Sequence, residues 1–244
     1  MEKPIKYAAR LSHVREVSLV GAADLGFWKR RLRRESLAPI EHEGGARVMV
    51  VAAEARYMGL KFREVSISVL AFASPGGARQ EGAYLLQAFN SSKLFTFFER
   101  KFFSTPYDHA DVERAAGFPS RIEVLDDDDR EVLFRVVMKA DPPGARAREP
   151  LRQGVEGWEG PVFLPTPAPE NEGKPQPPKL FFARLGGETR AYPFRRSEDL
   201  LTIKASSGIV ALQSLLDSAF APLEWIVRED AMHAKSKAQP RSAQ

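Results

Sequence analysis

The sequence has no cysteine among its 244 residues. That absence excludes a disulfide scaffold, thiolate metal ligands, iron–sulfur clusters and thiol catalysis. No apolar run approaches the roughly 18–20 residues that a membrane-spanning helix needs, and the first residues, MEKPIKYAAR, lack the apolar stretch of a signal peptide. The chain is therefore predicted to be a soluble, cytoplasmic protein that does not associate with membranes.

Motifs for metals and phosphates are missing as well. The four histidines (His13, His42, His109 and His233) have no pair at the close spacing of metal ligands, and there is no HExxH motif. The acidic run Asp126–Asp129 lacks the spaced ligands and the glycine of a calcium loop, so we interpret it as a hairpin turn. No GxxxxGKS/T or GxGxxG motif follows a predicted strand. We predict neither a metal nor a cofactor.

An amphipathic helix is predicted near the N-terminus, within Ala22–Arg34. Leu25, Trp28 and Leu32 recur on one face, and Asp24 is placed to cap the helix. Five of the seven residues from 28 to 34 are basic, in a chain whose net charge is only +4. Such a run is typical of a solvated helix face, and by itself it gives only weak, non-specific affinity for nucleic acid. Nucleic-acid binding is not predicted.

Strands are predicted over most of the remaining chain. Lys61–Phe72 alternates, with Val65 and Ile67 on one face and Glu64 and Ser66 on the other. Further strands are predicted at Arg47–Glu54, Ala83–Asn90, Ser120–Leu125, Arg130–Lys139, Leu180–Arg184, Glu188–Phe194 and Leu200–Ala205, with a hairpin turn at Gly186-Gly187. Many short strands with few helices favour an α+β fold, a mainly antiparallel sheet or barrel with helices packed outside.

Two further helices and two irregular segments complete the prediction. The helices span His109–Ala116 and Gly208–Phe220, and Pro222 closes the second. Residues 141–179 contain ten prolines and are interpreted as a long loop with extended pieces inside a single domain of residues 1–232. The polar residues 233–244 are predicted to be a disordered tail.

Glu64 has two interpretations on these patterns alone. In an open sheet it faces water, whereas in a closed barrel it lines an internal cavity, where burial raises the pKa of a carboxyl group. The densest polar segment is Phe97–Asp111 (FFERKFFSTPYDHAD), whose spacing is typical of a surface loop.

The order of the elements resembles the acetoacetate decarboxylase superfamily, over roughly residues 15–235. Arg47–Leu70 is similar to that family's paired strands, and Glu64 falls where its glutamate is expected. In the segment GAYLLQAFNSSKLFTFFERKFFSTPY, Arg100 and Pro106 match the Arg and Pro around the family's active-site turn. Residues 212–230 look like its closing helix.

The resemblance implies a closed, cone-like, mainly antiparallel β-barrel with peripheral helices, a buried polar cavity and assembly into a homo-oligomer. It also carries a departure. The family has two lysines after the proline, one of which forms a Schiff base, whereas Pro106 is followed here by Tyr107 and Asp108, which cannot form an imine. Lys101 stands where the family usually has Glu, and Val20 begins a segment that lacks the family's first-strand Arg.

These points predict a protein that binds a small keto or carboxylic acid in the cavity. If it is an enzyme, it is a lyase- or isomerase-type catalyst that uses non-covalent acid–base chemistry, such as enolisation or dehydration, rather than a Schiff-base decarboxylase. The candidate catalytic residues are Tyr107, Asp108 and Glu64, and the candidate substrate-binding residues are Arg100, Gln87 and Lys101.

The alternative is a non-catalytic ligand-binding or structural protein. Its cavity would be filled by the aromatic rings that are plentiful after residue 94, at Phe95, Phe97, Phe98, Phe102 and Phe103. An interior packed with these rings favours this alternative, and an interior lined by polar groups favours the first hypothesis.

Overall fold

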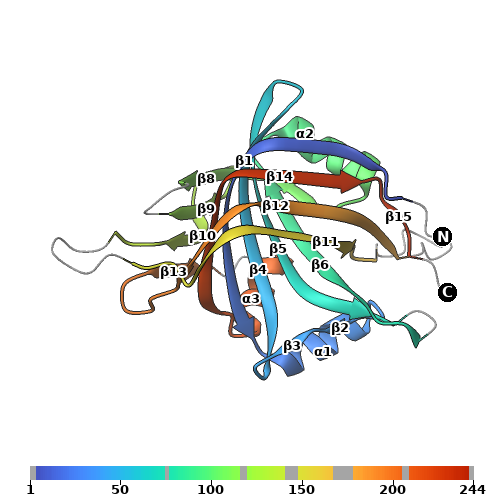
Figure 1. Ribbon diagram of the computed structural model, residues 1–244, viewed down its shortest axis with the longest axis horizontal. Coiled ribbons are helices and arrows are strands. Elements are labelled where there is room, and N and C mark those ends of the chain that lie inside the picture. The colour runs from blue at the N-terminus through green and yellow to red at the C-terminus, as the bar shows by residue number, and fades with distance from the viewer. Residues whose placement is uncertain are drawn as a thin grey trace.

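The computed structural model describes residues 4–74, 77–115, 120–140, 148–166, 178–204 and 209–241. Most of them lie in two sheets (Figure 1). The larger sheet contains β1 (Tyr7–Ala23), β2 (Ala38–Pro39), β3 (Glu41–His42), β4 (Gly45–Tyr57), β5 (Leu60–Ala73), β6 (Gln80–Asn90), β7 (Tyr107–His109), β11 (Arg152–Phe163), β12 (Lys179–Pro193), β14 (Ala221–Ser236) and β15 (Gln239–Pro240). The smaller sheet contains β8 (Asp111–Ala115), β9 (Arg121–Leu125), β10 (Val132–Val137) and β13 (Leu200–Ile203).

Seven strands of the larger sheet close into a ring. Their order is β5-β4-β1-β14-β12-β11-β6, and β6 pairs with β5 to complete the circle. All of these pairings are antiparallel except the one between β6 and β11. The predicted fold class, a closed, mainly antiparallel α+β architecture with helices outside, is confirmed. Because β5 and β14 lie across the ring from each other, side chains that point inward from both strands share one interior.

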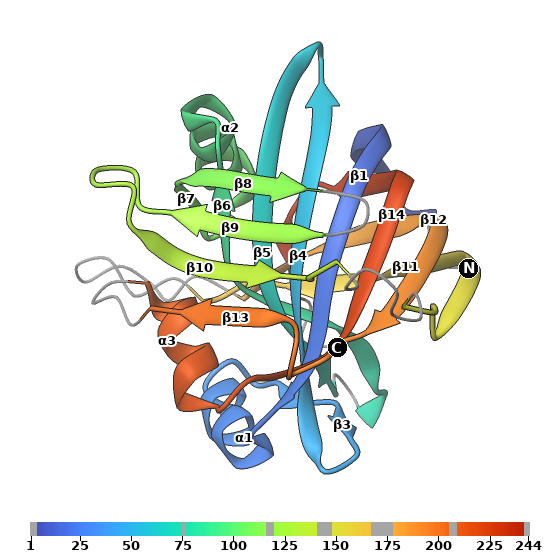
Figure 2. The same ribbon diagram turned by 90° about the vertical axis from the view of Figure 1, so that its left-hand side faces the viewer.

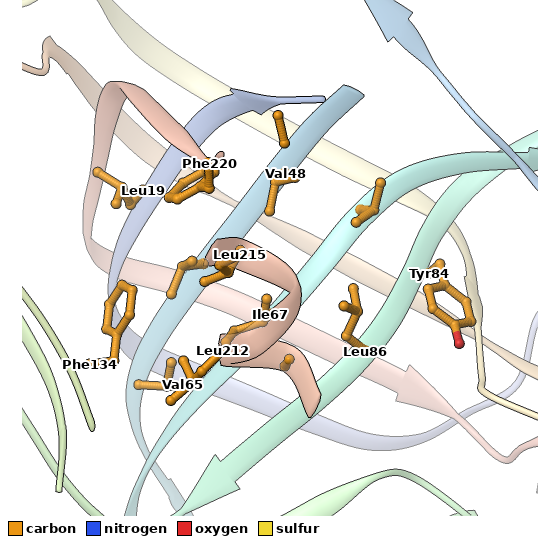
Figure 3. Packing of buried hydrophobic residues seen from close by; sticks show 14 of the residues in the cluster. Leu19, Val48, Val65, Ile67, Tyr84, Leu86, Phe134, Leu212, Leu215 and Phe220 are labelled. Atoms are coloured by element: carbon orange, nitrogen blue, oxygen red, sulfur yellow. The ribbon is translucent and has the colours of Figure 1, made fainter. Parts of the chain in front are cut away.

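The main apolar core lies outside the ring. Figure 2 shows the smaller sheet lying across strands of the ring, and Figure 3 shows α3 (Val210–Asp217) packed against the same outer face. Val65 and Ile67 of β5 meet Leu212 and Leu215 of α3 there, and all four are buried. The apolar face of β5 therefore packs in this outer core. Because successive residues of a strand point to opposite faces, Glu64 points toward the ring interior.

The first helix forms as the sequence predicts. α1 (Leu25–Arg33) begins after Asp24, whose carboxylate accepts a hydrogen bond from the Phe27 backbone N–H. Trp28 and Leu32 are fully buried against the sheet, so Trp28 anchors the helix and does not serve the basic face. Among the described residues, no helix is long and apolar enough to span a membrane.

Three predicted elements are wrong. The helix predicted over His109–Ala116 is absent from the described residues 109–115, since β8 pairs with β9 there and Val112 is buried in the core, so tertiary pairing overrides local propensity. Gly186-Gly187 is not a turn but lies within β12, where a Cβ on Gly187 would approach the Ala231 Cα to 3.0 Å. The resemblance to a closing helix holds only to Asp217, after which the chain becomes β14.

The proline-rich segment and the polar tail also contain strands. β11 occupies the middle of residues 141–179, while residues 141–147 and 167–177 lie outside the described residues. Much of the predicted tail is paired: β14 extends to Ser236, and β15 pairs with β12. Pairing with two neighbours stabilises a polar strand end that has little apolar surface of its own.

Candidate functional site

Charged and hydroxyl side chains from opposite walls gather inside the ring. Glu64 projects from β5, Tyr107 from β7, and His233 and Lys235 from β14. Glu16 projects from β1, where Val17 on the opposite face is buried in the outer core. We call these residues, together with Glu99 and Arg228 introduced below, the interior cluster.

Glu64 and Tyr107 are directly joined. The Tyr107 hydroxyl donates a hydrogen bond of 3.1 Å to Oε2 of Glu64. Burial raises the pKa of Glu64 and the negative charge of Glu99 adds to this effect, while His233, Lys235 and the tyrosine hydroxyl oppose it. Burial and the nearby carboxylates likewise raise the pKa of Tyr107 well above its ordinary value. The pair therefore combines a hydroxyl donor that stays neutral with a carboxyl group whose pKa is raised.

Lys235 forms the cationic part of the same wall. Its ammonium pairs with Glu99 of the π-helical turn η2 (Glu99–Phe103), which follows α2 (Lys93–Phe98). It lies 4.6 Å from the ring centre of Phe103, 4.5 Å from that of Phe181 and 5.7 Å from that of Tyr107. Lys235 thus has a carboxylate partner on one side and aromatic rings around the rest of its ammonium group.

Glu16 organises the deeper end of the cluster. Its carboxylate pairs with Arg228, lies 2.8 Å from the His233 Nε2 and accepts a 2.8 Å hydrogen bond from Ser18. Burial alone would raise the pKa of Glu16, but the hydrogen bonds and charges of His233, Arg228 and Ser18 outweigh it and lower the pKa to about 2. Glu16 is therefore an anion at neutral pH, held in place from three sides.

The cluster opens toward solvent at one end. Side-chain exposure is 1% at Glu16, 12% at His233, 17% at Lys235 and 20% at Glu99. Exposure thus rises along the cluster from the Glu16 end to the η2 end. A buried apolar group packs beside the η2 end and consists of Leu85, Ala88, Tyr107, Val162, Leu164, Phe181 and Ala183. An apolar surface therefore lies beside the charged groups at the more exposed end of the cluster.

Inside the ring, the structure brings together only two of the six candidate site residues from the sequence, Glu64 and Tyr107. Asp108 follows Tyr107 on β7 and points to the other face, where its carboxylate accepts a 2.5 Å hydrogen bond from Gln87. Gln87 in turn accepts a hydrogen bond from the Ala211 backbone N–H at the start of α3. Neither side chain reaches Glu64, because successive residues of a strand point to opposite faces.

The two basic candidates lie outside the ring interior. Arg100 is exposed and lies 3.6 Å from the Asp108 carboxylate, and Lys101 is exposed on the same turn. Neither residue lines the interior, where Lys235 and His233 are the basic groups that oppose the rise in the pKa of Glu64.

The phenylalanines do not fill the interior. Phe97, Phe98 and Phe102 are exposed on α2 and η2, and Phe95 packs at the edge of a small cluster with Phe62. Only Phe103 contacts the interior cluster, through Lys235. The alternative of a ring packed with these five aromatic rings does not match this placement.

Glu16, Arg228, His233 and Lys235 were not identified from the sequence. One signal was present, because the segment VREVSLV places Glu16 and Ser18 opposite Val17 and Leu19, the same alternation that marked Glu64. The residues on β14 had no such signal, since their polarity is typical of a surface or a tail.

Comparison with solved structures identifies the architecture. The chain superimposes on acetoacetate decarboxylase from Legionella pneumophila with a TM-score of 0.64 at 12% identity, covering 99% of this chain and 92% of that one. It superimposes on the enduracididine biosynthesis enzyme MppR complexed with pyruvate with a TM-score of 0.62 at 12% identity, covering 100% and 93%. For an acetoacetate decarboxylase-like enzyme from Sphingomonas wittichii the TM-score is 0.59 at 13% identity, covering 97% and 94%.

The chain has the acetoacetate decarboxylase-like fold. The sequence matches no protein-family model and no curated protein. At 12–13% identity the likeness establishes the acetoacetate decarboxylase-like fold and its order of elements, not the chemistry. Within this fold, the turn after Pro106 places Tyr107 in the interior, where its hydroxyl meets Glu64.

Proposed function

We propose that the protein binds a small keto acid at the solvent-facing end of the interior cluster and catalyses non-covalent proton transfer next to its carbonyl group. The observation that carries this proposal is the contact between Glu64 and Tyr107 inside the ring, beside the ammonium of Lys235. The complex of the similarly folded MppR with pyruvate supports a keto acid as the ligand class.

The proposed roles follow from charge and geometry. Lys235 and His233 attract the ligand carboxylate, and the apolar wall beside Tyr107 holds its carbon skeleton. Glu64 removes a proton from the carbon next to the carbonyl, and the electron pair moves to the carbonyl oxygen. The Tyr107 hydroxyl, now relieved of its bond to Glu64, donates to that developing oxyanion. Returning a proton to carbon or losing a leaving group completes an enolisation or a dehydration.

Exchange of the methyl protons of pyruvate for deuterium in heavy water tests the proposal. Proton NMR should show exchange catalysed by the protein, and Glu64→Gln should reduce its rate at least ~100-fold, the lower range for loss of a general base. Tyr107→Phe should reduce the rate as well. Absence of both exchange and binding with pyruvate and with acetoacetate would contradict the proposal.

Asp108→Asn distinguishes the two acids. The sequence-based hypothesis of a Tyr107–Asp108 pair predicts lost exchange, whereas the geometry predicts retained exchange, because Asp108 is half exposed and bonds to Gln87 on the outer face. A loss as large as that of Glu64→Gln would reassign the base to Asp108.

Stability provides an internal check on Glu64. Its folded-state pKa is raised, so the folded protein loses stability as the pH rises through the ordinary glutamate range. Glu64→Gln removes a charge that burial disfavours, and urea unfolding at neutral pH should show unchanged or slightly higher stability. A variant that is stable yet inactive has lost chemistry and not its fold.

Borohydride trapping tests the proposed absence of imine chemistry. After incubation with acetoacetate or pyruvate and borohydride, the intact mass should be unchanged, because Tyr107 and Asp108 stand directly after Pro106 and Lys235 is paired with Glu99. A stoichiometric adduct mapped to Lys235 would show instead that β14 supplies a Schiff-base nucleophile, and it would overturn the non-covalent mechanism.

A further inference from the structure

A polar pocket lies on the outside of the ring, between α1 and β6. It has a volume of about 420 Å³ and is lined by Phe27, Arg30, Arg31, Arg34, Glu35 and Tyr84. None of these residues belongs to the interior cluster. The volume is within the usual range of small-molecule sites.

The charges in this pocket are unbalanced. Glu35 is already engaged, since it accepts hydrogen bonds from the Tyr84 hydroxyl at 3.2 Å and from the Thr166 hydroxyl at 2.7 Å. Within the part of the chain that the structure describes, Arg30, Arg31 and Arg34 form no ion pair and no side-chain hydrogen bond. Three guanidinium groups therefore face one carboxylate that other groups already occupy.

Arg31 adds an independent observation. Its Nε is buried and has no hydrogen-bond partner, although a buried unsatisfied donor is costly. On the same helix, Lys29 pairs with Glu41 at 3.7 Å, and Arg33 is exposed and does not line the pocket. Arg31 thus differs from the solvated basic residues beside it on the helix.

The helix is held rigidly enough to present these groups. Trp28 and Leu32 are fully buried, and they hold α1 so that Arg30 and Arg31, with Arg34 at its C-cap, lie next to Tyr84. Figure 3 shows Tyr84 among the buried residues of the core, so the opposite wall of the pocket is anchored too.

We propose that this pocket binds a small multivalent anion through phosphate or carboxylate groups. The planar guanidinium group presents paired donors that match both kinds of oxyanion, and a ligand oxygen would satisfy the Nε of Arg31. The rings of Phe27 and Tyr84 offer an apolar wall for the rest of the ligand. This site does not depend on the function proposed for the ring interior.

Calorimetric titration of the full chain with pyrophosphate and with citrate, at about 0.15 M salt, tests the proposal and separates the two oxyanions. We expect one ligand per chain. Arg31→Gln and Arg34→Gln should each weaken binding about ten-fold, as expected for a lost charge-assisted hydrogen bond. Arg33→Gln is the matched control, because it removes the same charge from the same helix outside the pocket, and it should weaken binding less than two-fold.

Three results would overturn the proposal. The first is no saturable binding of either anion, and the second is an equal loss in Arg33→Gln, which would indicate a diffuse positive field. The third is tight binding of a duplex DNA probe without binding of either small anion, which would assign the face to nucleic acid. Arg34 is exposed, so its variant keeps the test valid if Arg31→Gln unfolds.

Discussion

Replacing Glu16 with glutamine should lower the free energy of unfolding by about 3 kcal/mol, the lower end of the cost of breaking a buried ion pair. The glutamine keeps the shape but leaves Arg228 and His233 without their anion in a site where Glu16 is 1% exposed. Urea unfolding at pH 7 measures the change. Glu81→Gln is the control, because its pair with Arg79 is exposed and should change stability by less than about 1 kcal/mol.

Comparing the wild-type protein with Glu16→Gln at different pH values gives a second test. The pKa of Glu16 is about 2 in the folded protein against 4.5 ordinarily, so the unfolded chain takes up the proton first as the pH falls. The stabilisation is complete above pH 4.5 and is lost as the pH falls toward 2, with a total of about 3 kcal/mol. The stability difference between wild type and Glu16→Gln should shrink across that window. A difference that stays constant down to pH 2 would show that Glu16 does not carry this charge interaction.

Replacing Trp28 with alanine should lower the free energy of unfolding by about 3–5 kcal/mol, because it leaves a cavity where the side chain holds α1 on the sheet. Trp28 is fully buried, and its ring meets Phe27 edge-on with centroids 5.1 Å apart. Its indole N–H has no hydrogen-bond partner, so Trp28→Phe loses packing without losing a hydrogen bond and should cost less. The midpoint and slope of urea unfolding measure both variants.

Phe102→Ala is the aromatic control for this series. That ring is 66% exposed on η2, and its removal should change stability by about 0.5 kcal/mol or less. If Trp28→Ala costs no more than Phe102→Ala, α1 is not anchored by its tryptophan. Amide hydrogen exchange along α1 should rise in Trp28→Ala, since the helix loses its main contact.

Local periodicity explains what the sequence could reveal. α1 and the alternation of β5 follow from patterns within a dozen residues, and the inward direction of Glu64 follows once β5 has an apolar face to bury. The resemblance to the acetoacetate decarboxylase superfamily added the closed ring, which no single segment encodes. Homo-oligomer formation stays a prediction.

The missed residues share a physical cause. Inside a closed ring, polar side chains have the same sequence signature as polar side chains in water, so Lys235 and His233 were assigned to a solvated tail. Their role depends on partners far away in the chain, as in the pairing of Arg228 with Glu16, 212 residues apart. Asp108 lies outside the ring interior for a local reason. Tyr107 points into the ring, and the next residue of the same strand must point to the opposite face.

The pairing of β1 with β14 also has a consequence for biosynthesis. β1 is synthesised before β14, so the carboxylate of Glu16 is made long before its partner Arg228, which lies 212 residues further along the chain. At about 5–20 residues per second, the delay is roughly 10–40 seconds. During this interval β1 can pair with β4 but the ring stays open, with the edges of β1 and β12 that face β14 unprotected. Newborn chains therefore depend on β14 to protect these two edges, and premature termination before β14 would leave them prone to aggregate.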